Sequence, residues 1–246
     1  MSLPRFHCTP LDPQPGATAV LTDAEARHAR QILRLRQGDR TELFDGAGIE
    51  VIAEVVGPHG QTLIMRVLEA RTAAMELPIR VVVAAAVLKG DAMDALVRDV
   101  SMLGAHAIEP VVTARTVIPA RAGSAAGVVE RWGRIALASA KQCGRSVLPL
   151  IEPARPLAEA LVDPSWQHAT RLILCEPDTG AAGATASPGI SDDVVLLSGP
   201  EGGWAPEELA AAIAHGWRPW TCSPMTMRAE TAPVAALAIL GWMRRR

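Results

Sequence analysis

The sequence of 246 residues has no apolar run near the roughly 20 residues that a membrane-spanning helix requires. Its first residues, MSLPRFHCTPLDPQPG, lack the apolar core of a secretory signal peptide. A composition of 49% hydrophobic and 20% charged residues is typical of a folded globular protein. We therefore expect a cytoplasmic protein with no membrane partner, built as one large domain or two modest ones.

Cysteine and histidine are both scarce and scattered. The four cysteines are Cys8, Cys143, Cys175 and Cys222, with no Cys-x-x-Cys pair and no nearby histidine partner. The six histidines are equally dispersed. This pattern predicts reduced thiols rather than a disulfide framework, and it predicts no metal site.

Lysine is nearly absent, because Lys89 and Lys141 are the only lysines among 24 basic residues. Genomic base composition accounts for much of that bias, although arginine is also the better residue for bidentate phosphate contacts. The net charge of −2 gives no global signal for nucleic acid. Local clusters of arginine therefore have to decide whether the protein binds RNA or DNA.

The chain divides into two regions of different pattern, with a predicted domain boundary in residues 69–78. Residues 1–72 contain short alternating segments with glycine-rich turns, which predict a small β-barrel or sheet. One helix interrupts them, with Thr22 and Glu25 as its predicted capping box and DAEARHARQILRL as its body. Residues 73–246 form the second predicted domain.

In the second domain, longer apolar strands alternate with helices. The run RVVVAAAVL shows no polar alternation, as expected for a strand buried on both faces of a parallel sheet. The stretch DAMDALVRDVSMLGA has apolar residues at helical spacing and a glycine stop. Repeated strand and helix patterns predict an α/β domain with a mostly parallel sheet. Residues 178–193 are predicted to form a surface loop.

The most unusual segment is Gly199–Gly203, GPEGG, at the end of the apolar run VVLLS. Its glycines permit positive φ or a close approach of the backbone to a ligand. The dinucleotide fingerprint G-x-G-x-x-G and the Walker A motif are both absent. An acidic, glycine-lined turn at a strand end suits a ligand with cationic and hydroxyl groups, such as S-adenosyl-L-methionine. An ordinary tight strand-helix connection is the weaker interpretation.

Two C-terminal motifs, LSGPEGGWAPEEL and MRAETAPVAAL, resemble the paired motifs of the RsmE family of SPOUT-class methyltransferases. HARQILRLRQGDRTELFDGAG resembles the PUA-like N-terminal domain of that family, and residues 88–116 and 131–149 resemble its central segments. The resemblance covers nearly the whole chain. It implies methylation of N3 of a uridine in 16S ribosomal RNA of the small ribosomal subunit.

The resemblance also implies a trefoil knot in the α/β domain, a bound S-adenosyl-L-methionine and a homodimer. By the same resemblance, the cofactor is bordered by the turns after three strands: Leu174, Glu176, Ser198, Gly199, Pro200, Glu201, Gly202, Gly203, Cys222, Ser223 and Met227. The sequence departs from the family pattern in the last turn, where Ser223 replaces a glycine and Met225 replaces an arginine. These departures concern the RNA target and the rate more than the fold.

Arg228 and Glu230 are the candidate catalytic residues. The N3 proton of uracil must leave before or during methyl transfer, and a carboxylate could accept it. An arginine could stabilise negative charge on the flanking oxygens. Glu230 could equally be an acid that complements the dipole of the helix that follows. Glu201 is expected to hold its turn or the cofactor rather than to move a proton.

Several arginines are candidates for RNA binding. In the N-terminal helix three of them are expected to share one face, since they are three and seven positions apart, and Arg36 follows closely. A solvated basic face is the usual meaning of such a stripe, but phosphate binding is favoured in a β-domain joined to an RNA enzyme. The candidates are Arg27, Arg30, Arg34, Arg36 and, more weakly, Arg145.

Two other functions remain open on the sequence. The protein could be a SPOUT methyltransferase with another RNA target, such as transfer RNA, or an RNA-binding protein that has kept the fold and lost the chemistry. A nucleotide-dependent oxidoreductase is disfavoured by the missing fingerprint. Trp132, Trp217, Trp220 and Trp242 are in apolar segments, which predicts core or dimer-interface positions rather than base-stacking platforms.

Overall fold

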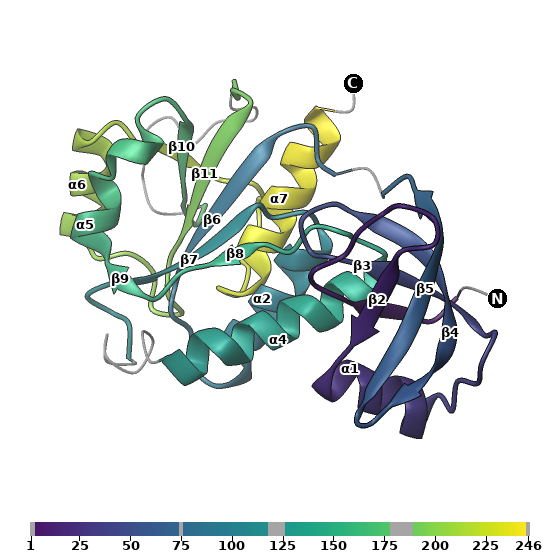
Figure 1. Cartoon of the computed structure of the whole chain (residues 1–246). Helices are drawn as coiled ribbons and strands as arrows, with labels where there is room; N and C mark the ends of the chain where they lie inside the picture. Colours follow the sequence, from purple (N-terminus) through teal and green to yellow (C-terminus); the bar gives the residue numbers. More distant parts are fainter. Residues whose placement is uncertain (1–2, 74–75, 118–125, 178–188, 245–246) are drawn as a thin grey trace. The chain divides into compact units, whose positions relative to one another are not determined.

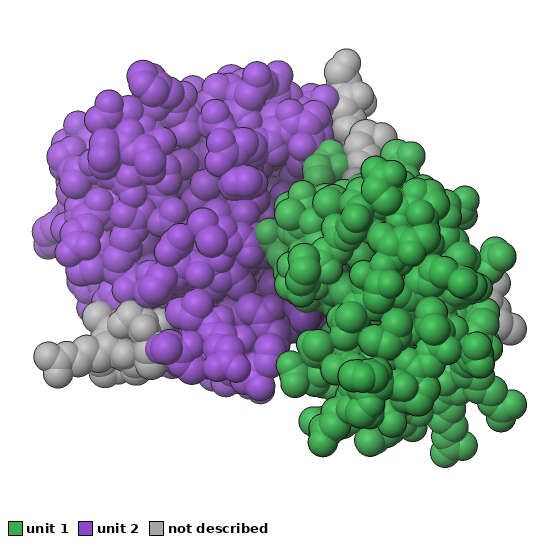
Figure 2. Space-filling view, in the orientation of Figure 1, with its two compact units in different colours: residues 1–76, 140–148 green, residues 77–139, 149–246 purple. Residues whose placement is uncertain are grey.

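A computed structural model describes residues 3–73, 76–117, 126–177 and 189–244 (Figure 1). The chain forms two compact units, coloured separately in Figure 2. Unit 1 contains Met1–Glu76 together with Ala140–Leu148, and unit 2 contains Leu77–Ser139 and Pro149–Arg246. The first division, between Glu76 and Leu77, lies within the predicted boundary segment of residues 69–78, four residues after the predicted end of the first domain at residue 72. The return of residues 140–148 to unit 1 was not predicted.

Unit 1 is built on a five-stranded mixed sheet with the order β1-β3-β4-β5-β2. The sequence predicted a small β-barrel or a sheet, and the strand pairings, which run in one path from β1 to β2, correspond to a sheet. Only the β1–β3 pair is parallel. The strands are β1 (Arg5–His7), β2 (Thr18–Leu21), β3 (Arg40–Phe44), β4 (Glu50–His59) and β5 (Thr62–Arg71).

Strands β4 and β5 form the centre of this sheet because their apolar residues fall on one face. Val55 of β4 is paired with Met65 of β5, and Ala53 with Val67, and all four side chains are buried. The alternation at period two thus places one apolar row of each strand in the core of unit 1. This confirms what the short alternating segments predicted.

The helix predicted after Thr22 is short and changes type. Helix α1 (Asp23–Arg27) is followed directly by a π-helix, η1 (His28–Ile32). The predicted capping box is wrong, because Thr22 makes no side-chain cap. Glu25 instead accepts two hydrogen bonds of 2.8 Å from Lys141 Nζ, so its carboxylate is bound to the segment of residues 140–148.

Hydrogen bonds and ion pairs of charged side chains join residues 140–148 to the rest of unit 1. The carboxylate of Glu50 is buried beside Arg5, and the hydroxyl of Ser146 donates to it. Burial alone would raise the pKa of Glu50, but the hydrogen bonds from Arg5 and Ser146 hold that pKa below its usual value. Arg5 also donates to the carbonyl oxygen of Arg145 at 3.1 Å. These contacts bring residues 96 and 140 positions apart in the sequence into one unit.

Unit 2 contains a fully parallel sheet with the order β12-β10-β11-β6-β7-β8, and β9 also pairs with β7. The predicted parallel α/β architecture is confirmed. Its elements are β6 (Arg80–Ala86), α2 (Asp91–Met102), β7 (Ala107–Val112), α4 (Ala126–Cys143), β8 (Leu150–Ile151), β9 (Arg155–Pro156), α5 (Leu157–Leu161), a 3₁₀ turn η2 (Pro164–Trp166), β10 (Thr170–Leu174), β11 (Asp193–Ser198), α6 (Pro206–Ala214), β12 (Arg218–Trp220) and α7 (Thr231–Met243).

Both faces of this sheet are covered, which explains why its strands lack polar alternation. In β6, Val81 and Val83 pack with residues of α2, α4 and α7, whereas Ala84 and Ala86 pack with residues of α5 and α6. The two groups of helices lie on opposite faces of the sheet in Figure 1. Among the described residues, no helix is both long enough and apolar enough to cross a bilayer.

Three of the four tryptophans predicted to be core or interface residues are in the core. Trp132, Trp217 and Trp220 are buried. Trp242, in the last turn of α7, has 57% of its surface exposed within one chain. Most of the loop predicted over residues 178–193 lies outside the described residues.

Candidate functional site

Three neighbouring strands of unit 2 end at the same edge of the sheet. Strand β10 lies between β12 and β11, and all three run parallel, so the segments that follow Leu174, Ser198 and Trp220 emerge side by side. This is the edge at which open α/β sheets bind ligands. The sequence predicted the three turns separately, and the strand order brings them together.

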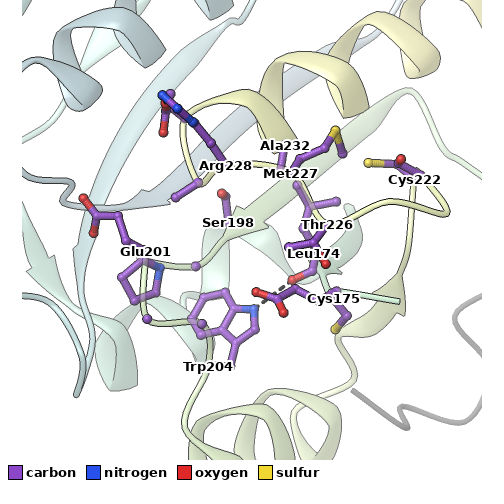
Figure 3. A pocket seen from close by; sticks show the side chains of 18 of the residues that line it. Leu174, Cys175, Ser198, Glu201, Trp204, Cys222, Thr226, Met227, Arg228 and Ala232 are labelled. Atoms are coloured by element: carbon purple, nitrogen blue, oxygen red, sulfur yellow. Dashed lines mark hydrogen bonds and ion pairs between the residues drawn. The ribbon is translucent and has the colours of Figure 1, made fainter. Parts of the chain in front are cut away.

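A cavity of about 530 Å³ lies at this edge, and we call it the strand-end pocket (Figure 3). Every residue that was predicted to hold the cofactor lines it, as do both candidate catalytic residues. The full lining is Arg115, Leu174, Cys175, Glu176, Pro177, Ser198, Gly199, Pro200, Glu201, Gly202, Gly203, Trp204, Cys222, Ser223, Met225, Thr226, Met227, Arg228, Ala229, Glu230 and Ala232.

The turn over Gly199–Gly203 has the close geometry that its glycines indicated. Gly203 has φ +69°, a conformation that L side chains rarely adopt, and its amide donates to the carbonyl of Pro200 at 2.9 Å. A Cβ atom on Gly199 would lie 3.0 Å from the ring of Trp204. Glu201 accepts a 2.8 Å hydrogen bond from the backbone amide of Lys89, which agrees with its predicted role in holding the turn.

Two residues that the sequence analysis did not identify also shape this pocket. The indole of Trp204 donates to the carbonyl of Leu174 at 2.8 Å, a bond drawn in Figure 3, and so ties the β10 end to the Gly199–Gly203 turn. Arg115, from the segment after β7, donates to the carbonyl of Gly202 at 2.7 Å. Trp204 follows the glycine turn directly, which was a usable signal, whereas only the fold brings Arg115 to the site.

The turn after β12 contains the two departures from the family pattern. Ser223 accepts a 3.1 Å hydrogen bond from the backbone amide of Met225, so its hydroxyl helps to shape the turn. Met225 is 72% exposed although it lines the pocket. Burial raises the pKa of the Cys222 thiol, with an opposing backbone hydrogen bond, so this pocket residue is a neutral thiol at physiological pH.

Arg228 and Glu230 lie where this turn leads into α7. The side chain of Arg228 is 86% exposed, and its Nη1 is 3.9 Å from a carboxylate oxygen of Glu230. Such an exposed pair is weak, so the guanidinium is free to turn toward a substrate. Glu230 occupies the N-cap position of α7 but makes no side-chain cap there. Figure 3 shows Arg228 and Glu201 at one end of the pocket and Cys222 at the other.

The pocket fits S-adenosyl-L-methionine in both size and chemistry. Its volume lies within the roughly 300–1,000 Å³ of ligand sites. The carboxylates of Glu176, Glu201 and Glu230 match the cationic groups of the cofactor, while Leu174 and Met227 supply apolar contact. The absence of a Cβ on the glycines of the turn leaves the backbone accessible. Among the described residues, no cluster of histidine, cysteine or acidic side chains could hold a metal ion.

The four N-terminal arginines are all exposed, but the common helical face predicted for Arg27, Arg30 and Arg34 does not extend to Arg34. Arg27 ends α1 and Arg30 lies in the π-helix, where residues are spaced more widely per turn than in an α-helix. Arg34 lies beyond the helix with φ +54°. Arg36 is exposed in the turn that follows, where its amide donates to Asp39. The arginines thus form a cluster on one segment rather than a stripe.

Arg145 does not have the environment of an RNA-binding residue. It is only 6% exposed, and its Nε donates to both carboxylate oxygens of Glu76, at 3.0 and 2.8 Å. A guanidinium that is buried and ion-paired offers no free cation to a phosphate. The sequence did not show that residues 140–148, which include Arg145, pack into unit 1.

Two models of known protein families match the chain. A family model described as an RNA methyltransferase domain matches residues 75–241, and one described as an RNA methyltransferase PUA domain matches residues 21–68. The chain belongs to this RNA methyltransferase family. The matched segments correspond to the parallel-sheet unit and to most of the N-terminal sheet.

Individual relatives agree with this family. The chain is 34% identical to the ribosomal RNA small subunit methyltransferase E of Synechocystis, over 90% of this chain and 72% of that protein. It is 25% identical to the protein of the same name from Bacillus subtilis, over 92% and 90% of the two chains. A crystal structure of ribosomal RNA small subunit methyltransferase E from Neisseria gonorrhoeae, bound to S-adenosyl methionine, superposes with a TM-score of 0.88 at 30% identity and covers 98% of each chain.

These similarities confirm the predicted RsmE family, its SPOUT-class α/β fold with a PUA-like domain, and an enzyme that uses S-adenosyl-L-methionine. They do not test the individual site residues. The roles of Arg228, Glu230 and the cofactor-binding residues rest on the geometry of the strand-end pocket.

Proposed function

We propose that this protein methylates N3 of a specific uridine in 16S ribosomal RNA of the small subunit, with S-adenosyl-L-methionine as methyl donor. The observation that carries the proposal is the convergence of all thirteen predicted cofactor and catalytic residues on one pocket at the strand ends. The names of the relatives and the bound cofactor in the Neisseria structure support it. The cytoplasm, where ribosomal RNA is available, is the proposed location.

The chemistry follows from the charges that change during transfer. S-adenosyl-L-methionine supplies a methyl group on a cationic sulfur that departs as a neutral thioether. Uracil loses its N3 proton as the new N–C bond forms, so negative charge grows on its two carbonyl oxygens. Arg228 is the described cation at the β12–α7 turn of the pocket, and we assign it to those oxygens. Glu230 is the candidate acceptor of the N3 proton.

The target is tested by incubating small ribosomal subunits and naked 16S RNA with purified protein and labelled S-adenosyl-L-methionine. We expect label in 3-methyluridine, at one position located by mass spectrometry of RNA fragments. Label in a different nucleoside, or only in transfer RNA, would contradict the proposed target. Cofactor binding without transfer to any RNA would favour the alternative of an RNA-binding protein that has lost its chemistry.

We expect the N-terminal arginine cluster to bind RNA phosphates. If Arg30 and Arg34 each neutralise one phosphate, their joint replacement lowers the salt slope of RNA binding by about 1.4–1.8, at roughly 0.7–0.9 per contact. Arg30→Ala is combined with Arg34→Asn, because asparagine tolerates the left-handed φ of position 34. Arg66→Ala is the control, since Arg66 of the same unit is ion-paired with Glu54. An unchanged slope would make the cluster an ordinary solvated surface.

We also propose that the protein works as a homodimer. The exposed Trp242, in the last turn of α7, supports a partner surface on this helix. Sedimentation equilibrium is expected to give about twice the 26.0 kDa chain mass at micromolar concentration. Trp242→Glu is expected to shift the protein to monomer. A wild-type protein that is monomeric at these concentrations would disprove the dimer.

A further inference from the structure

A second cavity, of about 550 Å³, lies wholly within unit 1, and its lining includes two of the arginines proposed to bind RNA. We call it the unit 1 cavity. One wall is the segment of α1 and the π-helix η1, and the other is the turn between β4 and β5, both visible in Figure 1. Its lining residues are Thr22, Asp23, Arg27, Arg30, Gln31, Gly60, Gln61 and Thr62.

The lining of the unit 1 cavity is polar and contains two kinds of group. Arg27 and Arg30 are exposed cations, and Arg30 also donates to the carbonyl of Gly60 at 2.9 Å, which ties the two walls together. Gln31, Gln61 and Asp23 present amide and carboxylate groups at the same cavity. Arginine matches phosphate, whereas amides and carboxylates match the hydrogen-bonding edge of a base.

The backbone around the cavity is strained, and strained backbone is frequent at binding sites. Asp23 has φ +46° and Arg34 has φ +54°, and these are the non-glycine residues with positive φ in the described chain. Asp23 begins α1, and Arg34 lies two residues after the end of η1. A π-helix between them is itself a feature that is frequent at functional sites. Strain of this kind persists where the surrounding structure holds it, often at binding sites.

Unit 1 has no exposed phenylalanine, tyrosine or tryptophan on which a base could stack. The chain contains no tyrosine, and both phenylalanines of unit 1, Phe6 and Phe44, are completely buried. All six tryptophans lie in unit 2. Most sequence-specific single-strand RNA readers stack bases on aromatic rings. Stacking on unit 1 is left to histidine rings and guanidinium groups, which do not distinguish one base edge from another, whereas the amides and the carboxylate of the unit 1 cavity can do so.

We propose that the unit 1 cavity binds one unpaired nucleotide of the RNA substrate whose base carries an exocyclic amino group. Arg27 and Arg30 hold its phosphate, and Asp23 accepts a hydrogen bond from the amino group. Adenine, cytosine and guanine each offer such a group, whereas uracil presents two carbonyl acceptors around a single N–H. A carboxylate only accepts, and a carboxylate that binds the N3–H of uracil also faces its flanking carbonyl oxygens, so uracil is disfavoured there. This inference rests on the proposed function in ribosomal RNA methylation and extends it to a base that is not the methylated uridine.

The test measures fluorescence anisotropy of labelled RNA hexamers of A, C or U with the full-length protein. We expect the A and C hexamers to bind roughly fivefold or more tightly than the U hexamer, which is the discrimination of one good base contact. Asp23→Asn retains the positive φ, because asparagine tolerates it, and adds an N–H donor to the cavity. This variant is expected to lose the preference against U. Equal affinities for all three hexamers, or an unchanged preference in Asp23→Asn, would overturn the proposal.

Two further variants separate base reading from charge. Gln61→Ala is expected to weaken binding of all three hexamers without changing the salt slope, because an amide both donates and accepts and carries no charge. Its control Gln14→Ala, an exposed amide of the same unit outside the cavity, leaves all three unchanged. Arg27→Ala is expected to weaken all three alike and to lower the salt slope by roughly 0.7. A Gln61→Ala variant that binds like wild type contradicts the base-reading assignment.

The outcomes also distinguish this proposal from the proposed function. If the protein methylates ribosomal RNA but shows no base preference, the proposed role of the unit 1 cavity is wrong and the assignment as a methyltransferase stands. If the wild-type protein prefers the A and C hexamers and Asp23→Asn loses that preference, but no ribosomal RNA is methylated, the proposed role of the cavity stands and the proposed function fails.

Discussion

Replacing Arg228 with alanine is expected to lower the rate of methyl transfer on the order of 10²–10³-fold, with the affinity for S-adenosyl-L-methionine unchanged within a few-fold. The guanidinium is assigned to uracil oxygens that gain negative charge only as the proton leaves. Its interaction is therefore stronger in the transition state than in the ground state, which is the condition for acceleration. The 86% exposure of its side chain and its weak 3.9 Å pairing with Glu230 leave it available to the base.

The measurement is single-turnover methylation of small subunits at saturating cofactor, together with calorimetry for cofactor affinity. Arg228→Lys is expected to recover only part of the rate, because an ammonium cannot reproduce the planar fork of a guanidinium. Arg98→Ala is the matched control, since Arg98 is an exposed arginine of the same unit that pairs with Asp99 on α2. If Arg228→Ala loses cofactor binding but keeps its maximal rate, Arg228 binds the cofactor rather than the base, and Glu230 becomes the leading catalytic candidate.

Replacing Gly203 with valine is expected to weaken binding of S-adenosyl-L-methionine about tenfold or more. The φ of +69° costs an L residue roughly 1–2 kcal/mol, and more for a β-branched side chain, so the turn has to move. A Cβ atom at position 203 would have a carboxylate oxygen of Glu176 as its nearest neighbour, at 3.7 Å. The side chain would therefore also project toward a residue that we assign to the cofactor.

Two other glycine variants separate backbone strain from occupied space. Gly203→Asn tolerates positive φ, so it is expected to retain more affinity than valine while still placing a side chain at the pocket. Gly133→Ala, inside α4 with open space around its Cβ position, is expected to bind the cofactor like wild type. Calorimetry measures each affinity, and circular dichroism checks the fold. A folded Gly203→Val variant with wild-type affinity would show that the cofactor does not approach this turn.

Local patterns in the sequence predicted the helices and strands of unit 2 well. The unbroken apolar run that became β6 and the helical spacing that became α2 both depend on which side chains face a core, and this is set by residue spacing alone. Local patterns predicted the structure less well where contacts with residues distant in the sequence determine it. The capping box at Thr22 failed because Glu25 binds Lys141, 116 positions away. The predicted helix is α-helical only over Asp23–Arg27 and continues as a π-helix, for reasons that spacing does not show.

The same division holds for the strand-end pocket. The glycine turn, the acidic residues and the resemblance of two motifs determined the family and indicated the residues that we assign to the cofactor, because these are properties of short contiguous segments. That the turns after β10, β11 and β12 form one pocket, that Arg115 and Trp204 hold it, and that Arg145 is buried against Glu76 were decided only by tertiary structure. Strand order and long-range ion pairs depend on contacts between residues far apart in the chain, and no local pattern in a single sequence encodes them.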